Sequence, residues 1–152
     1  MTAIADYFAV EPIIVEHIKA SVKNLEDVDT PFDIENMLDS VSVTPSVSVI
    51  YYGDRMGDST SNGKITTQYQ QWLIVLKVHD AEAQSKNTND LRAYANPFIL
   101  QLLSCLQGFD PKKYLPELVA YRQFKRADSP VGVGSAAGFG YFPFLFEIQM
   151  FI

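Results

Sequence analysis

The sequence offers few side chains for catalysis or metal binding. It contains one cysteine, Cys105, and two histidines, His17 and His79. A single cysteine excludes an intramolecular disulfide framework and any zinc or iron–sulfur site built from several cysteines. No serine lies in a G-x-S-x-G elbow, and the H-E-x-x-H spacing of zinc enzymes is missing. We therefore predict that the protein is not an enzyme and has no catalytic residue, metal ligand or cofactor.

Each of these residues can also be explained by a structural role without catalysis. Cys105 falls on the apolar stripe of a predicted helix, which favours burial over nucleophilic reactivity. His17 falls on the core side of another predicted helix, as a half-buried, hydrogen-bonded imidazole would. His79 and Asp80 end a predicted strand, where a surface turn is expected. A deep pocket in which His79, Asp80 and tyrosines converge would instead favour a small enzyme or ligand-binding domain.

The glycines of Gly132–Gly138 resemble a phosphate-binding loop in spacing only. A dinucleotide-binding loop leaves a strand and opens a helix, so that the helix N-terminus faces the pyrophosphate. Here the glycines lead into a predicted strand. We interpret the stretch as part of a flexible loop, Asp128–Gly138, that becomes ordered against a partner.

Three segments have the features of helices. Val10–Leu25 has apolar residues at every third or fourth position. Asp33–Leu38 forms a short helix capped by Thr30 or Asp33.

Asn87–Gln107 forms the longest helix, capped by Thr88 or Asn89, with Gly108 at the C-terminal position that needs a left-handed backbone. Pro97 should kink or divide it.

In four further segments, side chains alternate between two faces with the two-residue period of a strand. Val47–Tyr51 is half buried, and Tyr69–His79 is apolar on both faces, which predicts a central strand. The polar connection Gly53–Gly63 between them is too long for a tight turn and is expected to be a mobile loop.

Leu118–Arg126 and Phe139–Ile152 also alternate, and Pro143 predicts that the last strand is an edge or begins after this residue. Residues 1–152 thus predict one α+β domain. Its largely antiparallel sheet of about four strands packs against an N-terminal helix and a long central helix, and it carries long flexible loops.

Charge is divided unevenly along the chain. Residues 1–58 contain eleven acidic and three basic residues, whereas residues 59–152 contain seven acidic and nine basic ones. This division suits head-to-tail contact between copies, although ordinary solvated charge explains it equally well. The net charge of -6 argues against binding nucleic acid over the whole surface. Binding by the basic cluster alone is a third option, which no aromatic–basic stacking pattern supports. That cluster comprises Lys112, Lys113, Arg122, Lys125 and Arg126.

Three helices can cover one face of the sheet, so apolar residues of the other face are candidates for a surface covered by a partner. These residues are Leu73, Val75, Leu145 and Phe151. The start Met1–Val10 has no basic segment, and the apolar run Gly138–Phe146 is too short to span a membrane. We expect a soluble intracellular protein with its cysteine reduced.

The order of these segments resembles the tail-terminator, or tail-completion, proteins of tailed bacteriophages, and most nearly their Mu-like prophage branch. The shared features are an N-terminal amphipathic helix, a strand pair around a long loop (Val47–Tyr52 and Tyr69–His79), a helix ending in L-L-S-C-L-Q-G at Leu102–Gly108, and a closing strand. The resemblance covers most of the chain.

The resemblance implies a structural virion protein without enzymatic activity. Members form a hexameric ring that caps the tail tube, stops its polymerisation and offers a surface to the head. It implies three partners: further copies of the chain, the tail-tube protein and a head–tail connector protein. It also implies a place at the head-proximal end of the tail, after assembly in the host cytoplasm, with no membrane and no sequence-specific nucleic acid.

The loops Gly53–Lys64 and Asp128–Gly138 would dock to the neighbours, and free protein could be monomeric. Candidate interface residues are Arg55, Lys64, Arg122, Lys125, Arg126, Leu73 and Val75. A head–tail connector or neck subunit of similar fold is the alternative, followed by a small ligand-binding domain or enzyme.

Overall fold

The first helix follows its apolar stripe. The computed structural model describes residues 6–40, 43–60, 62–80 and 90–152. In it, α1 runs over Val10–Ser21 and buries four aliphatic side chains, Val10, Ile13, Ile14 and Ile18. The helix ends before the predicted Leu25, because the backbone is already extended at Val22, and the chain then turns at Asn24, whose φ of 68° is left-handed. That turn directs the chain into the sheet.

The other two helices were also predicted, with different details. The short α2, Ile34–Asp39, is capped by Asp33, whose carboxylate accepts from the backbone N–H of Asn36 at 2.8 Å. The long α3, Asp90–Leu106, continues through Pro97, so the predicted division of the helix is wrong.

Gly108 has a φ of 75°, as expected where a helix ends in a left-handed residue. The predicted caps of α3, Thr88 and Asn89, lie outside the described residues.

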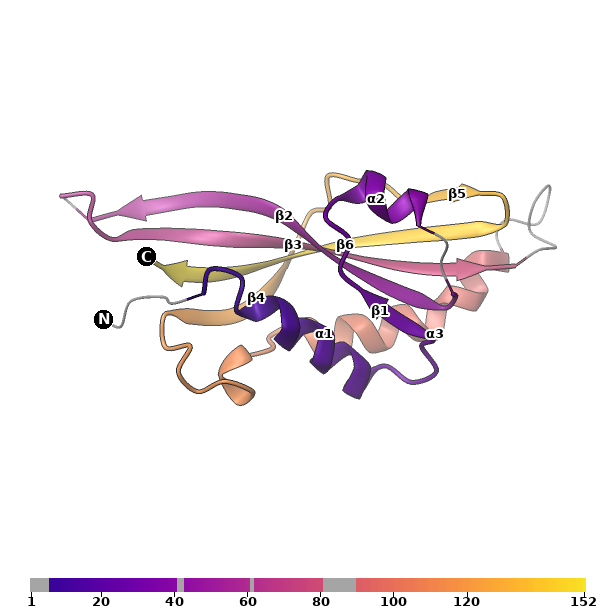
Figure 1. Ribbon diagram of the computed structural model, residues 1–152, viewed down its shortest axis with the longest axis horizontal. Helices are drawn as coiled ribbons and strands as arrows, with labels where there is room; N and C mark the ends of the chain where they lie inside the picture. The colour runs from indigo at the N-terminus through magenta and orange to yellow at the C-terminus, as the bar shows by residue number, and fades with distance from the viewer. Residues whose placement is uncertain (1–5, 41–42, 61, 81–89) are drawn as a thin grey trace.

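One mixed sheet organises the molecule, which confirms the α+β class (Figure 1). Its order is β1-β2-β3-β6-β4, with β5 also paired to β6. The strands are β1 (Asp27–Asp29), β2 (Ser46–Ser59), β3 (Thr66–His79), β4 (Tyr121–Ala127), β5 (Gly134–Ala136) and β6 (Phe139–Phe151). Among the described strands, the β1–β2 pair is parallel and the other pairs are antiparallel. The predicted central strand, Tyr69–His79, does lie in β3, between β2 and β6.

The predicted mobile loop Gly53–Gly63 is largely strand. Strand β2 continues to Ser59 and pairs with β3 as far as Thr66, so the connection is a short turn closed by Thr60 N–H donating to the carbonyl of Ile65 at 2.8 Å. A bulge between Tyr51 and Gly53 shifts the register, and the pairing with β3 continues beyond it. Because Asp54–Ser59 are all exposed, this part of the strand lacks the apolar alternation by which strands are recognised.

The last strand is not an edge, contrary to the expectation from Pro143. This proline pairs with Val75 of β3, so β6 is an interior strand. On the opposite side of β6, β5 pairs as far as Tyr141 and β4 pairs from Leu145 onward. Pro143 therefore lies between two outer neighbours, where its missing N–H costs no outer ladder hydrogen bond.

Strand β4 departs from simple alternation. The sequence placed Tyr121 and Phe124 on opposite faces, but both are buried in the same apolar cluster. A register shift between these two residues inserts an extra position and brings them to one face.

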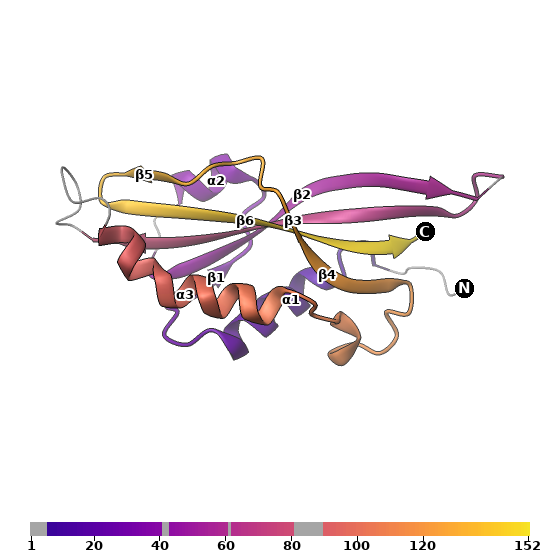
Figure 2. The same cartoon turned by 180° about the vertical axis from the view of Figure 1, so that it is seen from behind.

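Two apolar clusters hold the layers together (Figures 1 and 2). The larger lies between one face of the sheet and helices α1 and α3, and includes Trp72, Leu102 and Phe146. The smaller lies on the opposite face, where Met37 of α2 packs with Leu73 of β3.

The three long strands extend beyond this layered region (Figure 1). We call Ser46–Tyr51, Trp72–His79 and Phe139–Phe146 the proximal half, which has apolar clusters on both faces. The distal half comprises Gly53–Ser59, Thr66–Gln71 and Glu147–Phe151. It projects past α2 as a long β2–β3 hairpin beside the end of β6.

Candidate assembly surface

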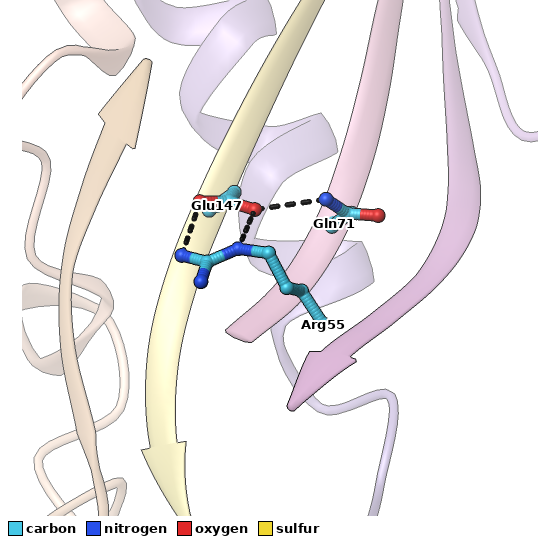
Figure 3. A network of polar contacts seen from close by, with 3 residues as sticks. All are labelled: Arg55, Gln71 and Glu147. Carbon is cyan, nitrogen blue, oxygen red and sulfur yellow. Dashed lines mark hydrogen bonds and ion pairs between the residues drawn. The ribbon is translucent and has the colours of Figure 1, made fainter. Parts of the chain in front are cut away.

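The distal half carries a polar network across three strands (Figure 3). Arg55 of β2 reaches across β3 and donates two hydrogen bonds to Glu147 of β6, at 2.9 Å from Nε and 3.0 Å from Nη2. Gln71 of β3 donates to the same carboxylate at 2.8 Å. The guanidinium also lies 4.1 Å from the centroid of the Tyr69 ring. These contacts join strands that are not neighbours.

The network favours the ionised form of Glu147. Hydrogen bonding from Arg55 is the main cause that holds the pKa of Glu147 below its ordinary value, and Gln71 adds to it, whereas partial burial acts in the opposite direction. Glu147 is therefore a carboxylate at neutral pH. Arg55 still exposes 53% of its side chain, so one part of it remains open to a partner.

Two further predicted cations share this face. Lys125 of β4 is directly opposite Glu147 in the β4–β6 register, and directly opposite residues lie on the same side of a sheet. The guanidinium of Arg122 lies 4.9 Å from the centroid of the Phe151 ring. We call this surface the distal face, made of Arg55, Tyr69, Gln71, Arg122, Lys125, Glu147, Gln149 and Phe151. Its residues are half-buried or exposed.

The other two predicted cations lie apart from the distal face. Lys64 is exposed in the turn that joins β2 to β3. Arg126 lies 5.2 Å from the ring centroid of Phe144. It borders a pocket of about 520 Å³ whose lining residues are Arg126, Ala127, Asp128, Ser129, Pro143 and Phe144.

Leu73 and Val75 are covered by the chain itself. Both are at most 2% exposed, in the cluster beneath α2. Leu145 is buried in the same cluster, whereas Phe151 is half-exposed on the distal face. The expectation that these aliphatic side chains await a partner placed all three helices on one face of the sheet, whereas α2 packs Met37 against the other face.

The residues with catalytic potential have structural surroundings. His17 bonds the carbonyl oxygen of Cys105 and the hydroxyl of Tyr114, each at 2.9 Å, and stacks on Phe109. Burial raises the pKa of the Cys105 thiol to about 11, so it is protonated at neutral pH. His79 is half-buried against the ring of Phe139.

Within residues 6–40, 43–60, 62–80 and 90–152, no three His, Cys, Asp or Glu residues are grouped to hold a metal ion. None of the helices in these ranges is both long and apolar enough to span a membrane.

Two features of the surface were missed from the sequence. Phe32 is 86% exposed, the most of any large hydrophobic side chain in the described part of the chain. Its signal was available, since it is an isolated aromatic residue in an acidic stretch. The second is Tyr7, whose hydroxyl donates to Asp54 and accepts from Gln68, holding the N-terminal segment against the hairpin.

A comparison with protein families identifies what the chain is related to. Residues 3–152 match the phage tail terminator protein family. The chain belongs to this family. No curated protein sequence matches it. Phage tail terminators are structural virion proteins, so the surfaces described above are those of a component of the phage tail.

Proposed function

We propose that this tail terminator caps the end of the phage tail tube as a ring of identical copies, hexameric in the virion. The ring stops polymerisation of the tube and forms the surface that joins the head. The observation that carries the proposal is the family match over residues 3–152. Its partners are further copies, the tail-tube protein and the head–tail connector protein, at the head-proximal end of the tail, after assembly in the host cytoplasm.

The shape of the molecule supports this role. The distal hairpin projects past the layered body and presents exposed backbone and charged side chains along β2 (Figure 1). A projecting two-stranded element with a polar, partly exposed face suits docking on another protein. The sheet also has chemically different edges, which suits a head-to-tail ring. We assign the phage to the Mu-like branch as part of the same proposal.

Removal of the gene tests the proposal. Phage lacking this protein should make tails of abnormal length that fail to join heads, and supply of the protein from a plasmid should restore both properties. Electron microscopy of purified tails should show a ring at one tube end, and mass measurement of that assembly gives the copy number. Tails of normal length without the protein would contradict capping. A ring found on the head side and absent from free tails would favour a connector or neck subunit.

A further inference from the structure

The outer side of α3 carries no charge. Residues 93–109 contain no Asp, Glu, Lys, Arg or His, although only one side of the helix packs in the larger cluster. On the other side, Leu100 exposes 61% of its surface and Tyr94 exposes 46%. Surface helices ordinarily carry charged or polar residues on the side that faces water, and the core of an interface is depleted of charge. The outer side of α3 thus has the composition of an interface. We call its exposed residues the neutral face: Ala93, Tyr94, Asn96, Pro97, Leu100 and Ser104.

The region around α2 exposes a second group of apolar side chains. Phe32, Leu38 and Val43 are exposed by between 51% and 86%. Glu35 and Asp39 are exposed among them, and neither takes part in the three ion pairs that join described residues. Residues 24–54 contain no lysine or arginine. We call these five residues the α2 face, which is both apolar and acidic.

The neutral face and the α2 face lie on opposite sides of the sheet. Met37 of α2 packs in the smaller cluster, whereas α3 packs in the larger cluster on the other side. Figures 1 and 2 show α2 on one side of the sheet and α3 with α1 on the other. A head-to-tail ring joins two different surfaces of each copy, and these two surfaces can meet in neighbouring copies without a two-fold axis.

The charge of the α2 face limits what it can contact. Two α2 faces would bring Glu35 and Asp39 of both copies together, and like charges across an interface repel each other. The neutral face has no acid to repel them. Contact between copies is therefore favoured when the α2 face of one meets the neutral face of the next.

Exposed cations adjoin the neutral face. Arg92 is exposed in the first turn of α3. The backbone N–H of Lys23 donates to Oε1 of Gln101 at 2.9 Å, which places this exposed lysine at the edge of α3. Each cation has an acid nearby in the sequence, Asp90 and Glu26. The border of the neutral face is thus mixed in charge, in contrast to the α2 face.

We infer that the α2 face of one copy packs on the neutral face of the next copy. Phe32 and Leu38 then lose their contact with water against Leu100. Glu35 and Asp39 lie at the border of this contact. Apolar anchors at the centre and charges at the rim are the usual organisation of an interface. Each copy offers α2 to one neighbour and α3 to the other, so the contact repeats around the ring.

This inference rests on the proposed ring, and thiol crosslinking tests it directly. The variant combines Leu38→Cys and Leu100→Cys in a Cys105→Ser background. Tails assembled with this variant are treated with a short bis-maleimide, which joins nearby thiols without the strict geometry of a disulfide. A ladder of covalent multimers up to the ring size is expected on a denaturing gel, because each copy is joined to the next. The variants with only Leu38→Cys or only Leu100→Cys should remain monomeric.

The matched control pairs Leu100→Cys with Val119→Cys. Val119 is 52% exposed and Leu38 is 51% exposed, but the neighbour Leu118 packs against the larger cluster, on the same side of the sheet as α3. No ladder should form from this pair. Dimers from Leu100→Cys alone would overturn the inference in favour of α3 pairing about a two-fold axis. Rings visible on tubes of the double variant without crosslinks would also overturn it, while leaving the proposed function intact. Normal tails without any protein would overturn both.

Two charged variants at Leu100 decide the question if the cysteines themselves prevent ring formation. Leu100→Glu places an acid against the acidic α2 face and should weaken ring formation about a hundredfold, whereas Leu100→Lys should weaken it only about tenfold. Both variants should keep the thermal stability of the wild-type protein, because Leu100 is 61% exposed. Equal losses from the two variants, or a larger loss from the lysine, would contradict contact with the α2 face. Rings at the wild-type level from both variants would contradict it as well.

Discussion

The proximal and distal halves of the same three strands are stabilised by different proportions of apolar and polar contacts. In the proximal half, apolar side chains are buried on both faces, with Trp72 on one side and Leu73 on the other. In the distal half, the buried positions include Gln68 and Gln70, which donate to the hydroxyl and carbonyl oxygens of Tyr7. The proximal half is packed by apolar clusters on both faces, whereas the distal half combines the buried Ile148 and Met150 of the larger cluster with these polar contacts.

This difference separates stability from function. Burial of apolar surface is the main term in folding, so the proximal half supplies most of the free energy of unfolding. The distal half adds less stability but presents Arg55, Tyr69 and Glu147 on an accessible face. A sheet that continues from a rigid body into such an extension can offer a polar face to a partner without weakening the body.

The largest effect is expected at Trp72. This side chain is fully buried in the larger cluster, next to the start of the distal half. Trp72→Ala removes that ring and should lower the free energy of unfolding by about 3–5 kcal/mol. Urea unfolding followed by circular dichroism measures the change, with Phe32→Ala as the exposed control. A loss no larger than that of the control would contradict the assignment of this half as the core.

Leu73 tests whether α2 covers the second face. Leu73→Ala should lower the free energy of unfolding by about 2–5 kcal/mol, because the side chain is fully buried with Met37 and Leu145. Val119→Ala is the control, since Val119 is 52% exposed. Impaired ring formation at unchanged stability would show instead that Leu73 faces a partner, as the sequence alone had suggested.

The sequence predicted elements whose side chains are buried and missed those whose side chains are exposed. The two apolar faces of Tyr69–His79 identified a central strand because both are covered. Gly53–Ser59 was taken for a loop, since an exposed strand has no pattern of burial to display. The three-residue strands β1 and β5 are too short to show any period.

The candidate site was predicted by residue type but not by geometry. Arg55 was selected as a cation, yet its partner Glu147 lies 92 residues away and is placed by strand register, which composition does not reveal. Phe32 was passed over because exposure depends on how the chain folds around β1. The division of charge between the two ends of the sequence was visible, whereas the position of β1 and β4 at opposite ends of the strand order was not.

A smaller effect is expected at Tyr7. Tyr7→Phe removes a hydroxyl that contacts Asp54 and Gln68, and should lower the free energy of unfolding by about 1 kcal/mol. The change should be local, because the hairpin depends on polar contacts. Hydrogen exchange should accelerate at amides of the distal half and stay unchanged at those of Trp72–Val78. Tyr52→Phe is the control, as this side chain is exposed on β2. Uniform acceleration in both halves would show that they unfold as one unit.

The smallest effect is expected at Glu147, and it depends on pH. Because the pKa of this carboxyl is lowered in the folded protein, the folded state holds its proton less tightly than the unfolded state does. The resulting stabilisation is present above the ordinary glutamate pKa of about 4.3 and is lost as the pH falls through the lower folded value. Glu147→Gln removes this contribution and should flatten the acid limb of the stability curve.

Glu16→Gln is the matched control for that measurement, since Glu16 is exposed on α1 and belongs to none of the three ion pairs among the described residues. Thermal unfolding between pH 3 and pH 7 should separate the two variants only on the acid side. Equal curves would mean that the Arg55–Glu147 pair orients the distal face without stabilising it. The effect is small because Arg55 is largely solvated, and the polar network that positions the assembly surface is thus distinct from the apolar core that keeps the protein folded.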